Sequence, residues 1–263
     1  MGVLNVTPDS FSDGGRFLSL DDAVAHGRRL AEEGADWIDV GGESTRPGAE
    51  PVPEAEEQRR VVPVIEALTA EGLQVSIDTR HEAVAQAAVA AGATLLNDVS
   101  SSLGEVAADL GVAWAAMHAQ GDPRTMQDAP QYDDVVAEVL DHLLTRAEAA
   151  RTAGVPQVWI DPGIGFGKTR AHNLALLAGL DRFVATGYPV LVGTSRKSFL
   201  GRLLADSDGV AEPVGTDDRL EGSLATATWA MANGAAMVRA HDVRTTVQAA
   251  LVVAGEITKD AAA

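Results

Sequence analysis

Three aspartates stand at the ends of short apolar segments, where their carboxylates could act on one ligand. Asp78, Asp98 and Asp161 each follow such a segment directly or after one residue. Carboxylates in a confined site accept hydrogen bonds from paired N–H groups of a heterocycle, and they stabilise a developing cation. Taken singly, Asp161-Pro-Gly is also typical of a turn and Asp78-Thr of a helix N-cap. Their equivalent positions favour one shared pocket, which all three should enter or border.

Basic residues occupy similar positions. The chain has three lysines, and both Lys168 and Lys197 lie in polar clusters after apolar segments. Arg196 and Arg239 follow the seventh and eighth apolar segments, and His241 comes two residues after Arg239. Arginine side chains and the N–H groups at helix starts bind phosphate well. These segments therefore predict a phosphate or diphosphate site, with pairing of either arginine to a nearby carboxylate as the alternative.

Glycines and aromatic residues add features of a ligand pocket. The segment 161–168 reads DPGIGFGK, which has the spacing of neither a P-loop nor a dinucleotide-binding motif. Such a glycine-rich segment indicates close approach of the backbone to a ligand. Phe166 lies among these glycines, so we interpret it as an apolar wall for a ring. Pro8 and Phe11 give the first polar segment the character of a lid.

The sequence lacks the patterns of several other kinds of site. It has no cysteine, which excludes disulfides, iron–sulfur clusters and thiolate zinc sites. The six histidines show no paired metal-ligand spacing, and no G-x-S-x-G motif is present, so neither a hydrolytic zinc site nor a serine triad is expected. Four histidines on predicted helices or at their starts are expected to be solvated: His26, His81, His142 and His172.

The elements that position these residues alternate between strand and helix, which is typical of a parallel α/β fold. Apolar segments predict strands at Gly2–Asn5, Trp37–Gly41, Val75–Ile77, Thr94–Asn97, Ala113–Met117, Val158–Ile160, Pro189–Gly193 and Ala236–Val238. Amphipathic segments predict helices at Asp21–Glu33, Pro53–Ala70, Glu82–Ala91, Leu103–Leu110, Tyr132–Ala153, Asn173–Thr186, Leu220–Ala232 and Val243–Ala254. Glycines expected to end helices in the left-handed conformation are Gly34, Gly72, Gly92, Gly111, Gly154, Gly187 and Gly234.

Eight strand–helix units in about 250 residues favour a (β/α)8 TIM barrel over an open doubly wound sheet of five or six strands. We predict a single domain over residues 1–263. On a barrel, catalytic residues lie at the carboxyl ends of the strands. The polar clusters follow the predicted strands, whereas the segments that lead into the strands are short and consist mostly of Gly, Ala and Val. One face of the ring should therefore carry the chemistry.

Composition limits the partners. The 263 residues are 46% hydrophobic, enough for a sizeable core, and the net charge of −18 opposes binding to nucleic acid or an anionic membrane. The chain begins without a signal-peptide pattern and contains no apolar stretch approaching about 20 residues. We expect a cytoplasmic protein that acts on small molecules.

Nine motifs follow one another over nearly the whole chain: MGVLNVTPDSFSDGG, IDVGGESTRPGA, SIDTR, NDVS, MHAQGDPRTMQ, DPGIGFGK, LVGTSRKSFLG, RLEGSLATA and VRAHDV. Together they resemble the dihydropteroate synthase family, and NVTPDSFSDGG, GGESTRPG and DPGIGFGK are the most specific. The resemblance implies a transferase of folate biosynthesis. Such an enzyme condenses 6-hydroxymethyl-7,8-dihydropterin diphosphate with 4-aminobenzoate, by dissociative displacement of pyrophosphate. It also implies Mg²⁺, a homodimer and inhibition by sulfonamides.

The resemblance further implies roles for individual residues. The pterin is expected to contact Asp78, Asn97, Met117, Asp161, Phe166 and Lys197. The expected catalytic residues are Asp13, Asp78, Asp161 and Lys197. The diphosphate is expected to contact Asn5, Arg239 and His241, with Asn5 also a ligand of Mg²⁺. The 4-aminobenzoate side should comprise Thr45, Arg46, Pro47, Phe166 and Ser198, and the lid Pro8, Asp9, Phe11 and Asp13.

One departure and two alternatives accompany the resemblance. Ser101-Ser102 replace glycines that the family pattern has after NDVS, which could alter the fourth loop.

A methyltransferase that passes a folate methyl group to a corrinoid would share the Asp/Asn pterin pocket, but would not call for Ser-Thr-Arg-Pro in the second loop or Ser-Arg-Lys-Ser after the seventh strand. A catalytically silent pterin-binding paralogue is disfavoured because Asn5, Lys197, Arg239 and His241 are all present.

Overall fold

The computed structural model describes residues 1–7, 19–44, 51–121 and 125–255. The first half of the chain forms β1 (Gly2–Asn5), α1 (Leu20–Glu32), β2 (Ile38–Gly41), α2 (Glu54–Ala70), β3 (Val75–Asp78), α3 (Glu82–Ala90), β4 (Leu95–Asp98), α4 (Gly104–Leu110) and β5 (Ala113–Met117). The second half forms α5 (Val135–Ala153), β6 (Val158–Asp161), α6 (Arg170–Ala178), α7 (Leu180–Val184), β7 (Leu191–Val192), α8 (Ser198–Asp208), a 3₁₀ turn (Thr216–Asp218), α9 (Leu220–Ala232), β8 (Met237–Val238) and α10 (Val243–Val253).

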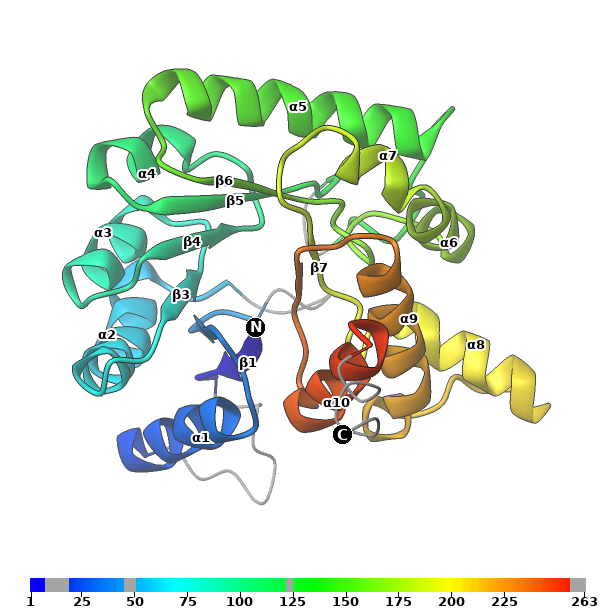
Figure 1. The fold of residues 1–263 in the computed structure, drawn as a ribbon, viewed down its shortest axis with the longest axis horizontal. Coiled ribbons are helices and arrows are strands. Elements are labelled where there is room, and N and C mark those ends of the chain that lie inside the picture. Colours follow the sequence, from blue (N-terminus) through cyan, green and yellow to red (C-terminus); the bar gives the residue numbers. More distant parts are fainter. Residues whose placement is uncertain (8–18, 45–50, 122–124, 256–263) are drawn as a thin grey trace.

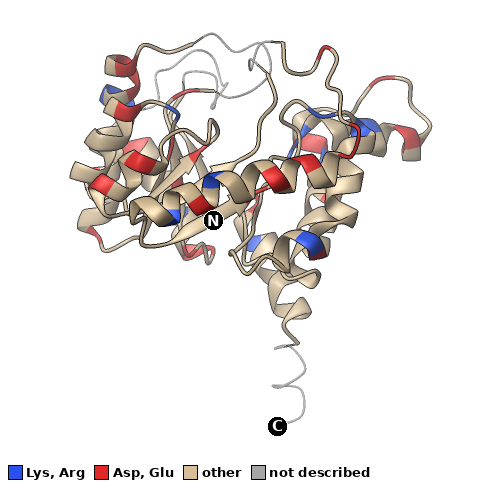
Figure 2. Cartoon of the chain, turned by 90° about the horizontal axis from the view of Figure 1, so that it is seen from above, with Lys and Arg blue, Asp and Glu red and all other residues tan. Residues whose placement is uncertain are grey.

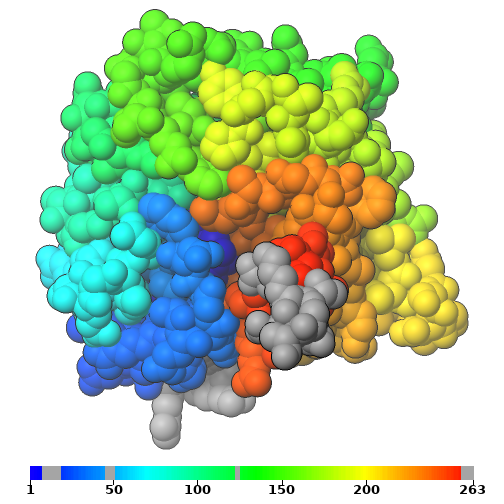
Figure 3. All heavy atoms as spheres, in the orientation of Figure 1, coloured from blue at the N-terminus to red at the C-terminus, as the bar shows by residue number. Residues whose placement is uncertain are grey.

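The strands close into a ring. β1 to β6 form a parallel sheet in sequence order, and β7 pairs in parallel with β8. Parallel bridges join Ile160 to Val190 and Gly2 to Ala240, so β6 leads into β7 and β8 returns to β1. Figure 1 shows the ring with its helices outside, and Figure 3 shows the N-terminal residues against the C-terminal segments. The predicted (β/α)8 barrel is confirmed.

The local predictions differ from the structure mainly between β6 and β8. The helix expected over 173–186 is two helices, α6 and α7, divided at Gly179. α8 was not predicted, because its first residue belongs to the polar Ser-Arg-Lys-Ser motif that we interpreted as a loop. β7 and β8 each contain two residues. The glycines expected to end helices all have positive φ, as predicted.

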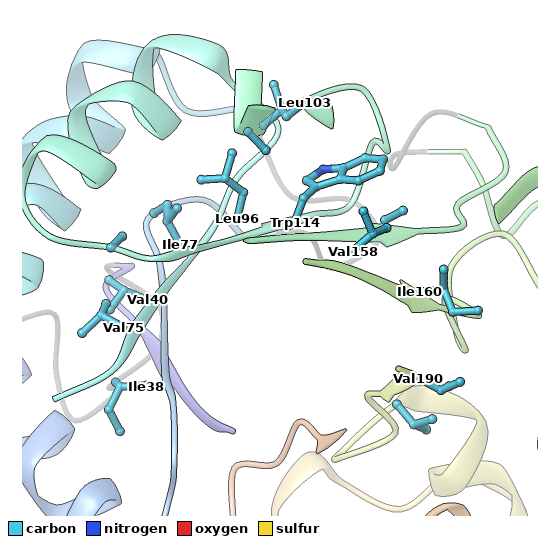
Figure 4. Close-up of a cluster of buried hydrophobic side chains, with 14 of the residues drawn as sticks. Ile38, Val40, Val75, Ile77, Leu96, Leu103, Trp114, Val158, Ile160 and Val190 are labelled. Atoms are coloured by element: carbon cyan, nitrogen blue, oxygen red, sulfur yellow. The ribbon is translucent and has the colours of Figure 1, made fainter. Parts of the chain in front are cut away.

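Alternation along the strands separates two layers of side chains. Ile38, Val75, Leu96 and Ile160 point away from the centre of the ring and pack under the helices (Figure 4). The residues between them point inward, where Met1, Leu95, Ala115, Trp159 and Leu191 form a second apolar cluster. Successive side chains of a strand face opposite sides, so the inward set continues towards the carboxyl ends through polar residues. Apolar packing thus fills the barrel below a polar layer.

The outer surface is acidic, with carboxylates spread over the helices (Figure 2). Within the described part of the chain, no helix is long and apolar enough to cross a membrane.

Candidate active site

A pocket opens at the carboxyl ends of the strands. Its walls come from β3, β4, β5 and β6 and from the segments after β4, β6, β7 and β8. It is lined by Asp78, Asn97, Val99, Met117, Asp161, Phe166, Gly193, Ser195, Lys197, Arg239 and His241. All the residues predicted to contact a pterin are in this set, together with Arg239 and His241 from the predicted diphosphate group. The shared pocket inferred from the aspartates and basic residues is therefore present, although Asp98 does not belong to it.

A buried carboxylate beneath this cavity organises its floor. Asp39, in the middle of β2, is fully buried. One of its oxygens accepts a hydrogen bond from Ser76 Oγ at 2.6 Å, and the other accepts from Asn97 Nδ2 at 3.0 Å and Arg239 Nε at 2.6 Å. Asp39 therefore orients two side chains that line the cavity. Sequence reasoning missed it, although a charged residue inside an apolar strand, two positions before the inward-facing Gly41, is a usable signal.

Arg239 lies between two carboxylates. Besides its bond to Asp39, its Nη2 donates to Asp78 Oδ2 at 2.8 Å. Burial opposes the positive charge, but Asp39 and Asp78 outweigh it and raise the pKa of Arg239. Arg239 therefore pairs with carboxylates, as the alternative prediction had it. It also lines the cavity where we predicted the anion site. The guanidinium is held rigidly in the cavity wall by its ion pairs.

Asp161 and Lys197 form the opposite side of the cavity. Asp161 is buried at the end of β6, and its Oδ1 accepts a hydrogen bond from Gly163 N at 2.7 Å. Burial raises the pKa of Asp161, against the effect of the Lys197 charge. Lys197 Nζ lies 4.4 Å from the centre of the Phe166 ring and donates to the carbonyl of Ile164. The ammonium group of Lys197 therefore lies over the face of the Phe166 ring, where a cation is attracted electrostatically.

His241 is held by the segment after β7. Its backbone N donates to Ser195 Oγ at 3.1 Å, and its Nδ1 lies 3.0 Å from the same hydroxyl. The two contacts fix the orientation of the imidazole. Ser195, which sequence reasoning did not place in the site by itself, is a positioning residue for His241.

Lys168 does not lie with the other basic residues, although its position in a polar cluster after an apolar segment had suggested that it would. It is buried under the glycine-rich segment, with Nζ 2.9 Å from His118 Nδ1 and 3.0 Å from the carbonyls of Gly163 and Phe166. Burial lowers the pKa of His118 to about 3, so its ring is neutral and accepts this bond. Lys168 therefore does not line the cavity with the basic residues. Instead it ties together the backbone that carries Phe166.

Three further contacts hold the same segment. Gly165 N donates to Asn173 Oδ1 at 2.7 Å, and the Tyr132 hydroxyl donates to the carbonyl of Gly167 at 2.9 Å. Gly163 has a φ of 65°, and a Cβ there would collide with the carbonyl of His118. The glycines therefore serve close backbone packing as well as access to the cavity.

Replacing Lys168 with methionine should lower the free energy of unfolding by about 2–4 kcal/mol, because several buried carbonyls lose their donor. We also expect weaker pterin binding, since the segment that holds Phe166 is loosened. Urea unfolding followed by circular dichroism checks the first effect. The matched control Arg182→Met, at an exposed position of α7, should leave stability unchanged. An equal loss in both variants would contradict the role of Lys168.

Two of the described residues that we predicted for the site, Asn5 and Ser198, are not among those that line the cavity. Asn5 ends β1 and is close to Asp78 across Gly41, where a Cβ would lie 3.4 Å from Asn5 Oδ1 and 3.6 Å from Asp78 Cβ. Ser198 is exposed at the start of α8 and does not line the cavity. The remaining predicted site residues fall outside the described part of the chain: Pro8, Asp9, Phe11, Asp13, Thr45, Arg46 and Pro47.

Two charged residues proved to be structural. The expectation that Asp98 enters or borders the pocket was wrong, since it faces outward from β4. It accepts hydrogen bonds from Leu103 N at 2.8 Å and Trp114 Nε1 at 3.1 Å. Arg196 pairs with Asp242 at 2.7 Å, which is the carboxylate alternative. Neither contributes to the cavity walls.

Ser101, which replaces a glycine of the family pattern, has a backbone conformation typical of glycine. Ser101 has a φ of 53°, in the left-handed region that favours glycine. Its hydroxyl donates to the carbonyl of Met117 at 2.8 Å, which ties the fourth loop to β5. This contact offsets part of the conformational strain.

The four histidines expected to be solvated are partly buried. The rings of His118 and His142 are 5.0 Å apart, and His81 lies among glutamates near the start of α3. The prediction was wrong because a position on a helix or at its start does not reveal which neighbouring elements pack over it.

The comparisons with known proteins agree with this geometry. Residues 1–241 match the model of a family described as pterin binding enzyme. The dihydropteroate synthase of Mycobacterium leprae is 49% identical over 96% of this chain and 91% of its own length, and that of Escherichia coli K12 is 46% identical over 96% and 89%. The Yersinia pestis dihydropteroate synthase, solved with a sulfonamide drug, has a TM-score of 0.90 at 44% identity, covering 98% of this chain and 94% of that one. The Xanthomonas albilineans enzyme with 4-aminobenzoic acid has a TM-score of 0.88 at 49% identity, covering 97% and 91%. The chain therefore belongs to the pterin-binding enzyme family.

Proposed function

We propose that this chain is a dihydropteroate synthase. It condenses 6-hydroxymethyl-7,8-dihydropterin diphosphate with 4-aminobenzoate to give 7,8-dihydropteroate and pyrophosphate. The observation that carries the proposal is the single cavity in which Asp78, Asn97 and Asp161 meet Lys197 and Arg239. Acidic and amide groups suit the N–H edge of a pterin, and basic groups suit its diphosphate. The named relatives support the same activity.

The reaction breaks the bond between the pterin methylene carbon and the diphosphate oxygen, and the electron pair leaves with pyrophosphate. The resulting cation is delocalised over the dihydropterin. Asp78 and Asp161 stabilise that positive charge, while Arg239 and His241 hold the leaving group. The amine nitrogen of 4-aminobenzoate then forms the new C–N bond and releases a proton. A neutral arylamine is already nucleophilic at pH 7, so the step requires no dedicated general base.

A Mg²⁺ ion fits the donors at the end of β1. Asn5 offers an amide oxygen, which is a hard ligand of the kind that Mg²⁺ prefers, and substrate phosphates complete such sites. Asp78 lies close to Asn5 across Gly41. When bound, the ion supplies positive charge that makes pyrophosphate a better leaving group.

A pyrophosphate-release assay tests the function. With the pterin diphosphate and Mg²⁺, we expect release that depends on 4-aminobenzoate and yields one dihydropteroate per pyrophosphate. Sulfonamides should compete with 4-aminobenzoate, in keeping with the drug complex of the Yersinia pestis relative. Pterin binding without release would instead indicate a silent pterin-binding paralogue. Methyl transfer from a folate to a corrinoid would indicate the methyltransferase.

We expect kcat/KM for the pterin diphosphate to follow a bell-shaped pH profile. Burial raises the pKa of Asp78 to about 7, against the effect of Arg239, so below that value the carboxyl is protonated and loses its acceptor role. Burial lowers the pKa of Lys197 to about 8, so its charge is lost above that value. The maximum should lie between the two. A profile measured by pyrophosphate release should lose its acidic limb in Asp78→Asn, and a flat wild-type profile would contradict the assignment.

We also propose a cytoplasmic location and a homodimer, the latter on the family resemblance. Light scattering on the full chain tests the oligomeric state, with a mass of twice 27.3 kDa as the expected result.

A further inference from the structure

A second group of polar side chains lies outside the cavity, where the segment after β2 meets α2 and α3. Glu43 follows β2, Glu57 is in the first turn of α2, and His81 caps α3. Glu57 is fully buried. Among the described residues, no donor lies in hydrogen-bond geometry with either of its oxygens, and the buried His81 Nε2 has no such partner either. Buried polar atoms without partners cost free energy, so a group of them in one place requires an explanation.

The spacing of these side chains suits a shared cation. His81 Nε2 lies 3.5 Å from Glu43 Oε2 and 3.9 Å from Glu57 Oε2, and one ligand atom from each residue lies within 4.8 Å of the others. Nitrogen and oxygen ligands bind Zn²⁺ at about 2.0–2.2 Å, which places tetrahedral ligands about 3.4 Å apart. Small side-chain shifts would therefore bring the three donors to bonding distance.

The local charge also favours a cation. Glu54 Oε1 lies 3.5 Å from His81 Nδ1, so three glutamates surround the imidazole. Among the described residues, Arg80 pairs with both oxygens of Glu43, with Nη2 at 3.0 Å from Oε1 and Nε at 3.2 Å from Oε2. A divalent ion would supply the positive charge that one arginine does not.

We propose that Glu43, Glu57 and His81 bind a divalent cation, with Zn²⁺ as the best match. One imidazole and two carboxylates are ligands that Zn²⁺ accepts, and they leave a fourth position for water. The sequence alone could not predict this site, because its ligands come from three segments with no paired spacing.

The site has a structural consequence. Glu43 Oε1 also accepts a hydrogen bond from Val52 N at 3.2 Å, and Arg60 Nη1 donates to the carbonyl of Gly42 at 3.0 Å. A cation on Glu43 would therefore join the end of β2, the segment before α2 and the start of α3. If the proposed function holds, the cation would fix the position of Glu43, which stands two residues before Thr45 in the segment that we predict to contact 4-aminobenzoate.

Calorimetric titration of the metal-stripped full chain with ZnCl₂, without substrates, tests the proposal. We expect saturable binding of one Zn²⁺ and a rise in Tm. Glu57→Gln and His81→Gln should each weaken binding by at least about tenfold, as loss of a direct ligand requires. Glu57→Gln removes a buried unpaired charge, so it should fold at least as well as the wild type without metal. Its Tm should then respond little to Zn²⁺.

Two controls separate this site from others. Glu66→Gln makes the same chemical change at an exposed position of α2 and should leave binding intact. Asn5→Ala should also leave Zn²⁺ binding intact, because Asn5 belongs to the proposed Mg²⁺ position and not to this site. The measurement of Zn²⁺ binding does not depend on catalytic activity. The absence of saturable binding, wild-type binding by both Glu57→Gln and His81→Gln, or loss of binding in Asn5→Ala would each overturn the proposal. The first result would leave a proton shared by Glu57 and His81 as the explanation of the cluster.

Discussion

Replacing Arg239 with methionine should lower kcat/KM for the pterin diphosphate by about 10²–10³-fold, because a fixed cation at the leaving group is lost. KM for 4-aminobenzoate should change little, since Arg239 lies with Asp39 and Asp78 rather than on the predicted aminobenzoate side. Steady-state pyrophosphate release with each substrate varied in turn measures the two effects. Equal losses for both substrates would contradict the assignment.

The same substitution should also destabilise the barrel. It leaves Asp39 and Asp78 buried without their shared cation, which costs about 3–5 kcal/mol in comparable buried pairs. Adding Asp39→Asn removes one of the uncompensated charges, so the double variant should recover part of the stability but none of the activity. Urea unfolding of the two single variants and the double variant separates the structural effect from the catalytic one. Arg239→Lys should retain the charge but lose the two-sided hydrogen bonding.

Replacing Asp161 with asparagine should reduce kcat/KM for the pterin diphosphate by about 10²–10³-fold, since a charged acceptor in the cavity becomes neutral. The amide oxygen can still accept the hydrogen bond from Gly163 N, so the glycine-rich segment should keep its conformation. The free energy of unfolding should not fall, because burial disfavours the carboxylate. We therefore expect Asp161→Asn to lower the activity without lowering the stability.

A second readout connects Asp161 to Lys197. The Asp161 charge opposes the lowering of the Lys197 pKa, so Asp161→Asn should move the alkaline limb of the pH profile below its wild-type position. The matched control Asp242→Asn removes a carboxylate that pairs with Arg196 outside the cavity, and it should retain nearly full activity. An alkaline limb that stays in place in Asp161→Asn would contradict electrostatic coupling between the two residues.

The sequence by itself determined the units of the barrel and most of the cavity. Strand and helix signals depend on nearby residues, so Ala113–Met117 and Leu220–Ala232 were predicted at their observed bounds. Polar residues after successive parallel strands must gather at one face, which placed Asp78, Asp161 and Arg239 together. The motifs identified the family, because they preserve those positions in order. α8 was missed where a polar motif overlapped a helix start.

The tertiary structure decided which charged side chains line the cavity and which form pairs beneath or outside it. Asp39 and Asp98 are both acids on strands, yet Asp39 points inward to Arg239 and Asp98 points outward to Trp114. Lys168 was expected with the basic residues, but the packing of β5 against β6 turns it under the glycine-rich segment. The group around His81 forms only when α2 and α3 pack beside the end of β2. The partner of a charged side chain is set by contacts between residues that are distant in sequence. Local composition does not specify these contacts, so the sequence could not predict the partners.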